Sequence, residues 1–295
     1  MRCGVDVGGT TVKIGFIDNY KIIYSYSIPT NKETLFDDVL KSIKDYVDEN
    51  KIYLEFIGFG LPGNVRDNII VKLPNVGIEN YDLGAKVKEY FPNIRSKSSN
   101  DANCAALGEA LCDENRPNSS YFITLGTGVG GGYVYNGSVV DGVNSACGEV
   151  GHMFIDPIHN FKCACGLTGC LETVTSATGI VRLAKKYYKE FKTKIPEDMT
   201  AKDVFDAAKE KDPLGVFVLE MVSEYLGKAL ATFAVVVDVE CFYVGGGVSK
   251  CGEILIDTIK KYYKKYCFFA VKDTKIKLAQ LGNDAGMIGA AYLWK

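Results

Sequence analysis

The sequence predicts an α/β protein built from two related lobes. Short β-rich runs alternate with amphipathic helical runs along all 295 residues, and no linker or low-complexity tract interrupts them. A strand, a glycine turn and a second strand occupy residues 4–17, and the same order returns at 121–135. This repeat predicts an internal duplication, with two lobes facing a cleft. The length also fits two domains.

The elements of the first lobe follow from their residue patterns. Valine and isoleucine runs bounded by Gly8-Gly9 and Asp18-Asn19 predict strands, and apolar residues at helical spacing predict helices. The expected strands are Gly4–Val7, Val12–Ile17, Lys21–Ser27 and Phe56–Gly60, and the expected helices are Glu33–Asn50 and Asp101–Cys112. We assign residues 1–118 to this lobe and expect a C-terminal helix at 284–295 to complete it.

The second lobe, residues 119–283, is expected to be more helical. Its strands are predicted at Tyr121–Leu125, Tyr133–Tyr135 and Cys241–Val244, with a glycine turn at 126–132. Its helices are predicted at Ala177–Lys192, Ala201–Lys211, Leu214–Val237 and Glu253–Tyr266, and Ala285–Leu293 closes the chain.

Composition excludes several classes of protein. The 34 basic and 36 acidic residues give a formal net charge of −2, which argues against a nucleic-acid partner, and the lysine pairs at 260–261 and 264–265 suit a solvated helix face. No run is apolar and long enough for a membrane span, and Asp6 stands where a signal peptide would be apolar. Ten cysteines fit a reducing compartment, so we expect a cytoplasmic protein.

Three closely spaced cysteines form the most informative cluster. Cys163, Cys165 and Cys170 lie within eight residues, with Gly166 and Gly169 allowing the turns that bring three sulfurs to one ion. Three thiolates and one imidazole would make a closed structural Zn²⁺ site. The spacing leaves the fourth ligand open between His152 and His159, and a disulfide or free thiols are the alternatives. Glu149 and Glu172 flank the cluster, which suggests that a bound Zn²⁺ would fix these two carboxylates and so shape a small-molecule pocket.

Glycine-rich turns follow three of the predicted strands. Asp6-Val7-Gly8-Gly9-Thr10-Thr11 and Leu125–Gly132 occupy matching places in the two lobes, where backbone N–H groups and threonine hydroxyls can hold phosphate oxygens. Five glycines in the second run predict positive φ angles or close ligand approach. Gly245-Gly246-Gly247 suits flat contact with a nucleobase, or is simply a strand-to-helix turn. None of the three is a Walker A loop or a dinucleotide fingerprint.

Asn100-Asp101 stands where a strand is expected to end and a helix to begin. An acidic residue at this place is commonly an N-cap. The functional alternative is a general base that takes a proton from a hydroxyl attacking a phosphoryl group.

These motifs together resemble the ROK family of repressors and sugar kinases, and most closely its glucokinase branch. The resemblance runs from Gly4 to about Val181 and resumes at Gly245–Ser249. It implies the two-lobed actin-like ATPase fold, a duplicated ribonuclease H-like architecture. It also implies ATP, Mg²⁺ and a structural Zn²⁺ as cofactors.

The resemblance assigns a role to each motif residue. It implies His152, Cys163, Cys165 and Cys170 as zinc ligands and Asp101 as the catalytic base. The implied sugar contacts are Gly63, Asn75, Asn100, Asp101, Glu149, His152 and Glu172. The implied contacts to ATP and magnesium are Asp6, Gly8, Gly9, Thr10, Thr11, Lys13, Gly126, Thr127, Gly128, Gly246 and Gly247.

The expected function is therefore ATP-dependent phosphorylation of a hexose at its 6-hydroxyl, with glucose favoured. N-acetylmannosamine, fructose and allose remain alternatives, because Arg66 and Val76–Tyr81 depart from the family pattern at the rim of the implied sugar site. A sugar-sensing repressor is disfavoured because Asp6 leaves no room ahead of it for a helix-turn-helix domain. A catalytically dead sugar-binding protein is disfavoured because Asp101 and the phosphate glycines are present. We expect a homodimer or homotetramer; the choice between ATP and polyphosphate and any allosteric regulation stay open.

Overall fold

The computed structural model describes residues 1–294, which form two compact units. The first unit contains Met1–Asn118, Gly132–Cys147 and the described residues from Leu281 onward. The second contains Ser119–Gly131 and Gly148–Gln280. The sequence-based boundary at 118/119 placed residues 132–147 in the other lobe, and it stays a prediction. No helix among the described residues combines the length and hydropathy needed to cross a bilayer.

The first unit is built on a five-stranded sheet. Its strands are β1 (Arg2–Val7), β2 (Thr11–Asp18), β3 (Lys21–Pro29), β4 (Phe56–Leu61) and β8 (Arg95–Asn100), in the order β3-β2-β1-β4-β8. The first three strands are antiparallel, and β1, β4 and β8 are parallel. Every residue of β4 is buried, as its unbroken apolar run predicts for a central strand.

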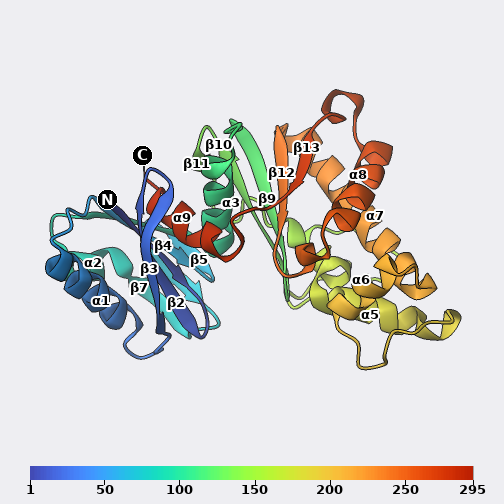
Figure 1. Ribbon diagram of the computed structural model, residues 1–295, viewed down its shortest axis with the longest axis horizontal. Coiled ribbons are helices and arrows are strands. Elements are labelled where there is room, and N and C mark those ends of the chain that lie inside the picture. The colour runs from blue at the N-terminus through green and yellow to red at the C-terminus, as the bar shows by residue number, and fades with distance from the viewer. Residues whose placement is uncertain (295) are drawn as a thin grey trace. The chain divides into compact units, whose positions relative to one another are not determined.

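Helices and a small second sheet complete this unit. Helix α1 (Leu35–Asn50) buries Leu35, Phe36, Val39, Leu40 and Ile43, the apolar stripe read from the sequence. Figure 1 shows α1 and α2 (Leu83–Tyr90) side by side near the first sheet. Strands β5 (Asn64–Arg66), β6 (Ile69–Leu73) and β7 (Ile78–Asp82) form the antiparallel sheet β5-β6-β7.

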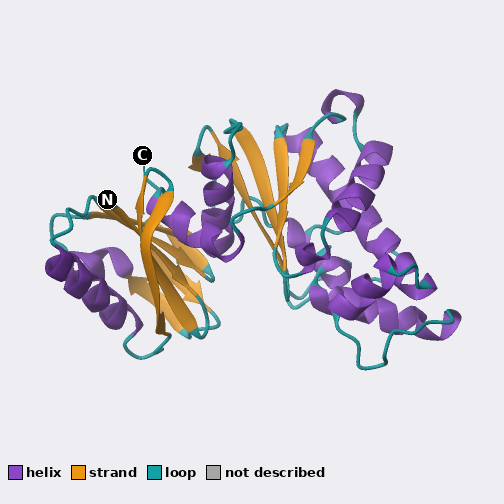
Figure 2. Cartoon of the chain, in the orientation of Figure 1, coloured by secondary structure: helices purple, strands orange, loops and turns teal. Residues whose placement is uncertain are grey.

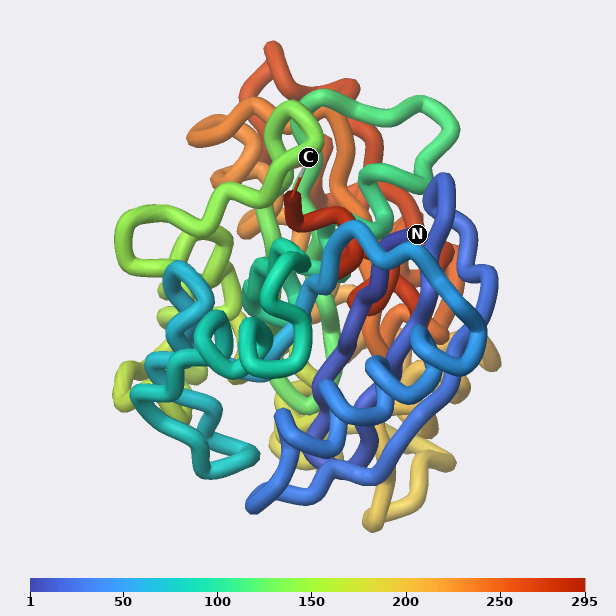
Figure 3. The backbone as a smooth tube through the Cα atoms, turned by 90° about the vertical axis from the view of Figure 1, so that its left-hand side faces the viewer, coloured from blue at the N-terminus to red at the C-terminus, as the bar shows by residue number. Residues whose placement is uncertain are grey.

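Glycine allows the carboxyl-terminal helix α9 (Ala285–Ala291) to pack against the main sheet and against α3 (Asp101–Cys112). A Cβ on Gly58 of β4 would lie 1.7 Å from the Ala290 carbonyl oxygen, and one on Gly4 of β1 would lie 1.9 Å from that of Met287. Figure 3 shows this red segment running among the blue and teal backbone of the same unit. Helix α9 therefore packs in the same core as strand β1, which the first residues of the chain form.

The second unit combines strands with a layer of helices, which Figure 2 shows in orange and purple. Its strands are β9 (Ser119–Leu125), β12 (Cys241–Gly245) and β13 (Lys275–Leu278), all parallel. Its helices are α4 (Glu172–Thr175), α5 (Ala177–Tyr187), α6 (Ala201–Lys209), α7 (Pro213–Val237) and α8 (Glu253–Tyr266). Asp212 caps α7 by accepting from the N–H groups of Leu214 and Gly215, with Pro213 at the first helical position.

The two main sheets share one strand order, as the predicted duplication requires. The second sheet runs β11-β10-β9-β12-β13, where β10 is Val129–Tyr135 and β11 is Ser138–Val139. When the strands of each sheet are numbered in chain order, both sheets have them side by side in the order third, second, first, fourth, fifth. The repeated strand, glycine turn and strand read from the sequence thus begin two copies of one topology.

Some elements differ from the sequence expectations. Strand β10 begins at Val129, inside the predicted glycine turn, and α5 ends at Tyr187 with a 3₁₀ turn at Tyr188–Glu190 instead of continuing to Lys192. The sequence analysis missed β8, whose residues Arg95–Asn100 are all polar or charged. It also missed the small sheet, α2, β11 and β13. Each of these segments is short, from two to eight residues, and carries no period long enough to detect.

Candidate active site and metal centre

In the first unit, β1 and β2 hold the turn that carries the predicted phosphate motif. The Gly8 N–H donates to the Thr11 carbonyl over 3.0 Å, and the Thr30 hydroxyl donates to the Gly8 carbonyl over 2.8 Å. Gly9, Thr10 and Thr11 are exposed, and a Cβ on Gly9 would meet no atom within 4 Å. The turn is thus fixed at its base and open at its tip, where an anion could approach the backbone.

Asp6 lies below this turn in a partly buried position. Burial raises the pKa of its carboxyl group, and the charge of Lys13, its cross-strand partner, opposes that rise. The carboxylate also lies 3.1 Å from where a Cβ of Gly286 would be, so a side chain at that place in α9 would crowd it. Lys13 donates from Nζ to the Asn283 carbonyl over 2.9 Å. That contact fixes the segment leading into α9, a role that the phosphate-motif interpretation did not include.

Asn100 ends β8 and caps α3. Its Oδ1 accepts from the N–H groups of Ala102 at 2.8 Å and Asn103 at 3.4 Å, and its Nδ2 donates to the Gly63 carbonyl over 3.2 Å. The sequence left the capping role open for Asp101, and the structure gives it to Asn100. Asp101 is the first residue of α3, is half-buried, and accepts from the Ala102 N–H over 2.8 Å.

Carboxylates gather around the first turn of α3. Burial raises the pKa of the Cys104 thiol well above its usual range, and the charges of Asp6, Asp101 and Asp141 raise it further. Three acidic side chains therefore lie near Cys104, and Lys97 opposes their effect on its thiol. Oxygen ligands of this kind suit Mg²⁺, so Asp6 and Asp101 fit the predicted cation chemically.

The other two predicted sugar contacts of this unit lie in loops. Gly63 follows β4, and a Cβ there would lie 2.2 Å from the Lys72 carbonyl oxygen, so the turn requires glycine. Asn75 is exposed in the turn between β6 and β7. The structure joins Gly63 to Asn100 by the hydrogen bond above.

Asp141 is a polar residue of this region that the sequence analysis did not identify. Its Oδ1 accepts from the Ser99 hydroxyl and from Asn103 Nδ2, each over 3.0 Å. Asp141 lines a cavity of about 510 Å³ together with Arg66, whose Nη2 donates to the Val143 carbonyl over 2.9 Å. An acidic residue directly before a glycine, in a run otherwise free of charge, was the signal available in the sequence.

In the second unit, four side chains converge in a possible metal centre. The ligand atoms of His152, Cys163, Cys165 and Cys170 all lie within 4.8 Å of one another. The Cys163 sulfur is 3.8 Å from His152 Nδ1, and the Cys165 and Cys170 sulfurs are 3.7 Å apart. Sulfurs bound tetrahedrally to Zn²⁺ at about 2.3 Å are separated by about 3.8 Å, so these distances fit the ion.

The backbone around the cluster supports the same chemistry. The N–H of Leu167 is the main cause that holds the pKa of the Cys165 thiol below its usual value, which favours a thiolate. Burial raises the pKa values of Cys163 and Cys170, a cost that a bound cation would offset. The Cys163 N–H donates to the Leu167 carbonyl over 2.8 Å, which closes the loop that carries the sulfurs.

His159, the other candidate ligand, lies in a different network. Its Nδ1 is 3.0 Å from Asp156 Oδ1 and its Nε2 is 2.8 Å from the Tyr187 hydroxyl, with a side-chain exposure of 1%. Tyr225 donates to the same Asp156 oxygen over 2.8 Å. This network joins the loop before the cysteines to α5 and α7, and it places the His159 ring among those partners.

Glu172 connects the metal centre to the second glycine run. Its Oε1 is 3.6 Å from the Cys163 sulfur, and its Oε2 accepts from the Val129 N–H over 3.0 Å. A Cβ on Gly128 would lie 2.5 Å from Oε2, so a side chain there would displace the carboxylate. Partial burial of the carboxyl group and the charge of Glu172 raise the pKa of Glu149, and His152 opposes that rise. The rest of the Glu149 side chain is exposed.

The glycines of the second run also serve packing, which the sequence interpretation missed. None of those from Gly126 to Gly132 has a positive φ angle. A Cβ on Gly131 would lie 1.6 Å from the Tyr121 hydroxyl oxygen, and one on Gly132 would lie 2.7 Å from Ala106 Cβ of α3. The turn itself is tied down, because Gly126 O accepts from the Ala177 N–H and Thr127 O from the Thr178 hydroxyl.

The third glycine turn lies at the carboxyl end of β12. Gly246 has a φ of +85°, which favours glycine, and its carbonyl accepts from the Ser249 hydroxyl over 2.8 Å. Gly247 is exposed, and a Cβ there would meet no atom within 4 Å. Carboxyl ends of parallel strands are the usual place for ligands in such sheets.

Comparison with known proteins decides the family. The family model described as "ROK family" matches residues 2–295. The chain belongs to the ROK family. This confirms the family predicted from the sequence motifs.

Relatives resemble the chain over its full length. A glucokinase from Halalkalibacterium halodurans is 40% identical, covering 99% of this chain and 94% of its own. An N-acetyl-D-glucosamine kinase from Vibrio parahaemolyticus is 33% identical, covering 99% of both chains. The solved ROK family glucokinase from Streptomyces griseus, in complex with glucose and AMPPNP, has a TM-score of 0.76, 29% identity and coverage of 99% and 98%. The predicted actin-like fold is confirmed by such neighbours.

Proposed function

We propose that the protein is an ATP-dependent hexose kinase that phosphorylates glucose at its 6-hydroxyl. The observation that carries the proposal is 40% identity to a glucokinase over nearly the whole of both chains. The predicted motifs all lie within this matched length, and the residues that the reaction needs are present in each of them.

Asp101 is proposed as the general base. Asn100 is the N-cap residue of α3, and Asp101 stands in the first helical turn, where its carboxylate shares the Ala102 N–H with the Asn100 side chain. It would take the proton of the 6-hydroxyl while that oxygen attacks the γ-phosphorus of ATP, and ADP would leave. The hydrogen bond between Asn100 and the Gly63 carbonyl fixes the start of the helix and hence the base.

The remaining roles are proposed from the family resemblance. Hydroxyl contacts are assigned to Gly63, Asn75, Asn100, Glu149, His152 and Glu172. Phosphate contacts are assigned to the turn at 8–11 and to Thr127 and Gly128, with Gly246 and Gly247 at the adenosine. Mg²⁺, held near Asp6, would neutralise charge on the transferred phosphoryl group. Zn²⁺ on His152 and the three cysteines would fix the Glu172 segment, because Cys163 lies next to that carboxylate.

A coupled assay of ADP release tests the proposal. Glucose, mannose, fructose, allose, N-acetylglucosamine and N-acetylmannosamine are compared, and ³¹P NMR identifies the phosphorylated position. We expect the highest kcat/KM with glucose and a 6-phosphate product. Absence of ADP release with every sugar would contradict the proposed kinase activity. A different best sugar would change the assigned substrate, while the proposed reaction would stand.

An N-acetylhexosamine kinase is the second candidate. N-acetyl-D-glucosamine kinases of 31–33% identity cover the full chain. The segment Val76–Tyr81, which departs from the family pattern, follows the exposed Asn75 and forms most of β7. A 2-acetamido group at this rim would need space and a hydrogen-bond partner, so a higher kcat/KM for N-acetylglucosamine than for glucose would favour this candidate.

A further inference from the structure

We propose that Asp141 is a positioning residue for the reaction and that it holds in place the segment carrying the base, Asp101. The inference rests on the proposed function and concerns contacts within the first unit alone. Asp141 lies two residues after the end of β11, yet its carboxylate is hydrogen-bonded to two residues 38 and 42 positions away, one on each side of Asn100-Asp101.

A single carboxylate oxygen connects the end of β8 to the first turn of α3. Asp141 Oδ1 accepts from the Ser99 hydroxyl and from Asn103 Nδ2, each over 3.0 Å. Ser99 directly precedes Asn100, and Asn103 comes two residues after Asp101. A general base must stay within about 2.6–3.2 Å of the group whose proton it takes. Contacts that restrain both flanks of this pair of residues therefore restrain the base.

Both donors are buried, so water cannot readily replace Asp141. Ser99 is 2% exposed and Asn103 is 5% exposed. Among the described residues, Asn103 Oδ1 is buried without a hydrogen-bond partner, so the bond from Nδ2 to Asp141 is the contact that orients this amide. Leaving a buried donor unpaired is unfavourable, which favours one fixed arrangement of the carboxylate and its two partners.

The loop that carries Asp141 is closed on itself. The Cys147 N–H donates to the Asp141 carbonyl over 3.1 Å, so the two ends of the loop are joined. Gly142, the next residue, has a φ of +77°, which favours glycine and turns the chain directly after Asp141. The carboxylate is therefore presented by a backbone whose direction is set locally.

Strand β5 joins the same loop to the start of α3. The Ser145 hydroxyl of the loop donates to the Val65 carbonyl over 3.1 Å. Two residues before Val65, the Gly63 carbonyl accepts from Asn100 Nδ2 over 3.2 Å. Together with the bonds of Asp141, these contacts form a closed circuit through the loop, β5 and the beginning of the helix. The proposed base follows Asn100 in that circuit.

Capping of α3 does not explain the contacts of Asp141. Asn100 is the N-cap residue, and Asp141 Oδ1 accepts from two side chains instead of from helical N–H groups. General stabilisation is the remaining alternative. A contact that only stabilises the fold changes the amount of folded protein, whereas a positioning contact changes kcat of the folded enzyme through the base.

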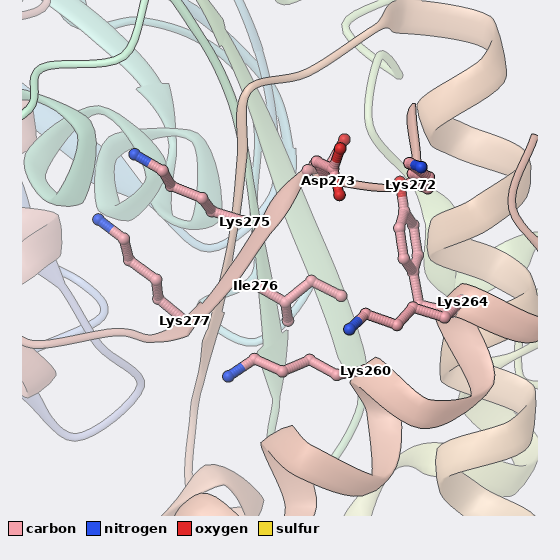
Figure 4. Close-up of a pocket in the computed structure, with 9 residues that line it drawn as sticks. Lys260, Lys264, Lys272, Asp273, Lys275, Ile276 and Lys277 are labelled. Atoms are coloured by element: carbon pink, nitrogen blue, oxygen red, sulfur yellow. The ribbon is translucent and has the colours of Figure 1, made fainter. Parts of the chain in front are cut away.

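The lysines beside β13 in the second unit show a contrasting arrangement of charged side chains. Figure 4 shows Lys275 and Lys277 leaving the strand on the face away from α8, so they do not converge with Lys260 and Lys264 of that helix. Those amines are directed to a solvated surface. Asp141 differs because one of its oxygens meets two buried donors at hydrogen-bond distance.

Steady-state kinetics with glucose and ATP test the proposal. Asp141→Ala removes the acceptor, and we expect kcat to fall by about ten-fold or more, since a misplacement of about 1 Å can cost about 10²-fold. Asp141→Asn keeps one acceptor oxygen and should lose less than about three-fold, because a neutral acceptor forms the same bonds more weakly. The control Ser42→Ala removes a hydrogen bond to Tyr26 elsewhere in the first unit and should keep the parental kcat.

The decisive measurement repeats Asp141→Ala in the Asp101→Asn background. If Asp141 acts through the base, its removal there should lower the remaining kcat by less than about two-fold, because residues that act as a unit have non-additive effects. A loss of equal size in both backgrounds would overturn the proposal, and so would a parental kcat for Asp141→Ala. A loss in Asp141→Asn as large as in Asp141→Ala would assign the effect to charge and not to positioning.

Circular dichroism verifies that each variant is folded. Ser99→Ala provides the same test if Asp141→Ala does not fold, because it removes one bond and leaves Asn103 its partner. We expect a fall in kcat of about three-fold that disappears in the Asp101→Asn background, and an unchanged kcat would contradict the proposal. A parent that releases no ADP with any sugar would overturn the proposed function and this inference together, whereas the outcomes above overturn this inference alone.

Discussion

Asn100 and Asp101 show how neighbouring polar residues divide two tasks at the start of one helix. The Asn100 side chain accepts two backbone N–H groups and donates to Gly63, so its polar atoms serve the fold. Asp101 accepts from the Ala102 N–H and is half-buried. If the cap and the proposed base are distinct residues, their substitutions should damage different properties.

Asp101→Asn should lower kcat by about 10²–10⁴-fold, because the amide cannot take the hydroxyl proton. The KM for glucose should change little, since the amide keeps the shape and one acceptor of the carboxylate. Steady-state kinetics on the variant, with Asp113→Asn at the other end of α3 as control, measure both values. Near-normal kcat would assign the base to another residue, with Glu149 the next candidate.

His152 and His159 should respond differently to removal. His152→Ala should lower the zinc content from about one ion per chain, because three sulfurs would then hold the ion with an open position. His159→Ala should keep the zinc and reduce the free energy of unfolding by about 1–3 kcal/mol, because it removes the imidazole partner of the buried Asp156. Mass spectrometry of the metal and denaturant unfolding separate these effects. Zinc loss on replacement of His159 alone would reverse the ligand assignment.

Helix ends show what local sequence can specify at the scale of an element. Asp212 stands before Pro213, and its carboxylate accepts from Leu214, Gly215, Lys194 and Thr193. Burial alone would raise its pKa, but these hydrogen bonds outweigh burial and hold the pKa below its usual value. The cap therefore also attaches α7 to the loop at residues 193–194.

Asp212→Ala should destabilise the protein by about 1–2 kcal/mol at pH 7. A carboxyl group with a lowered pKa in the folded state stabilises the protein above its unfolded pKa, about 3.9, and loses that contribution as the pH falls through the folded pKa. The difference between variant and parent should therefore shrink below about pH 4. Urea unfolding at several pH values measures it, with the exposed Asp198→Ala as control. A difference that stays constant with pH would refute the carboxylate explanation.

The sequence predicted those elements that have strong periods or end signals. Helix α3 and helix α8 match their expected bounds, because the Asn100 cap and the apolar period at 253–266 are local features. Strand β8, with the residues Arg-Ser-Lys-Ser-Ser-Asn, could not be predicted, because pairing with β4 and not its composition makes it a strand. The cysteine spacing identified three members of the metal cluster. Choosing between His152 and His159 needed the family resemblance, since the Asp156 network depends on residues 28 to 69 positions away.

At the scale of the whole molecule, long-range glycine contacts hold together segments from opposite ends of the chain. Gly4 and Gly58 of the sheet approach the carbonyl groups of Met287 and Ala290, so α9 lies closer to the strands than side chains would allow. Buried Glu109 adds a hydrogen bond over 2.9 Å from its Oε1 to the Leu281 N–H, where the chain re-enters the first unit.

Gly58→Ala should destabilise the protein by about 3 kcal/mol or more, because the new methyl group would overlap a backbone oxygen that cannot move alone. Gly247→Ala is the matched control, since a Cβ there meets no atom and its φ of −61° suits alanine. Thermal unfolding followed by circular dichroism compares the two. Similar melting temperatures for Gly58→Ala and the parent would mean that α9 is not seated against β4.

The position of α9 in the sequence also determines when the first unit can finish folding during synthesis. About 130 residues separate Cys147 from Leu281, and ribosomes add roughly 5–20 residues per second, so the first unit waits on the order of ten to thirty seconds for α9. During that interval the glycine-lined face of β1 and β4 has no cover. A nascent chain therefore keeps this unit incomplete until α9 has been made, and a chaperone or a pause in elongation during that period would act on this face of the sheet.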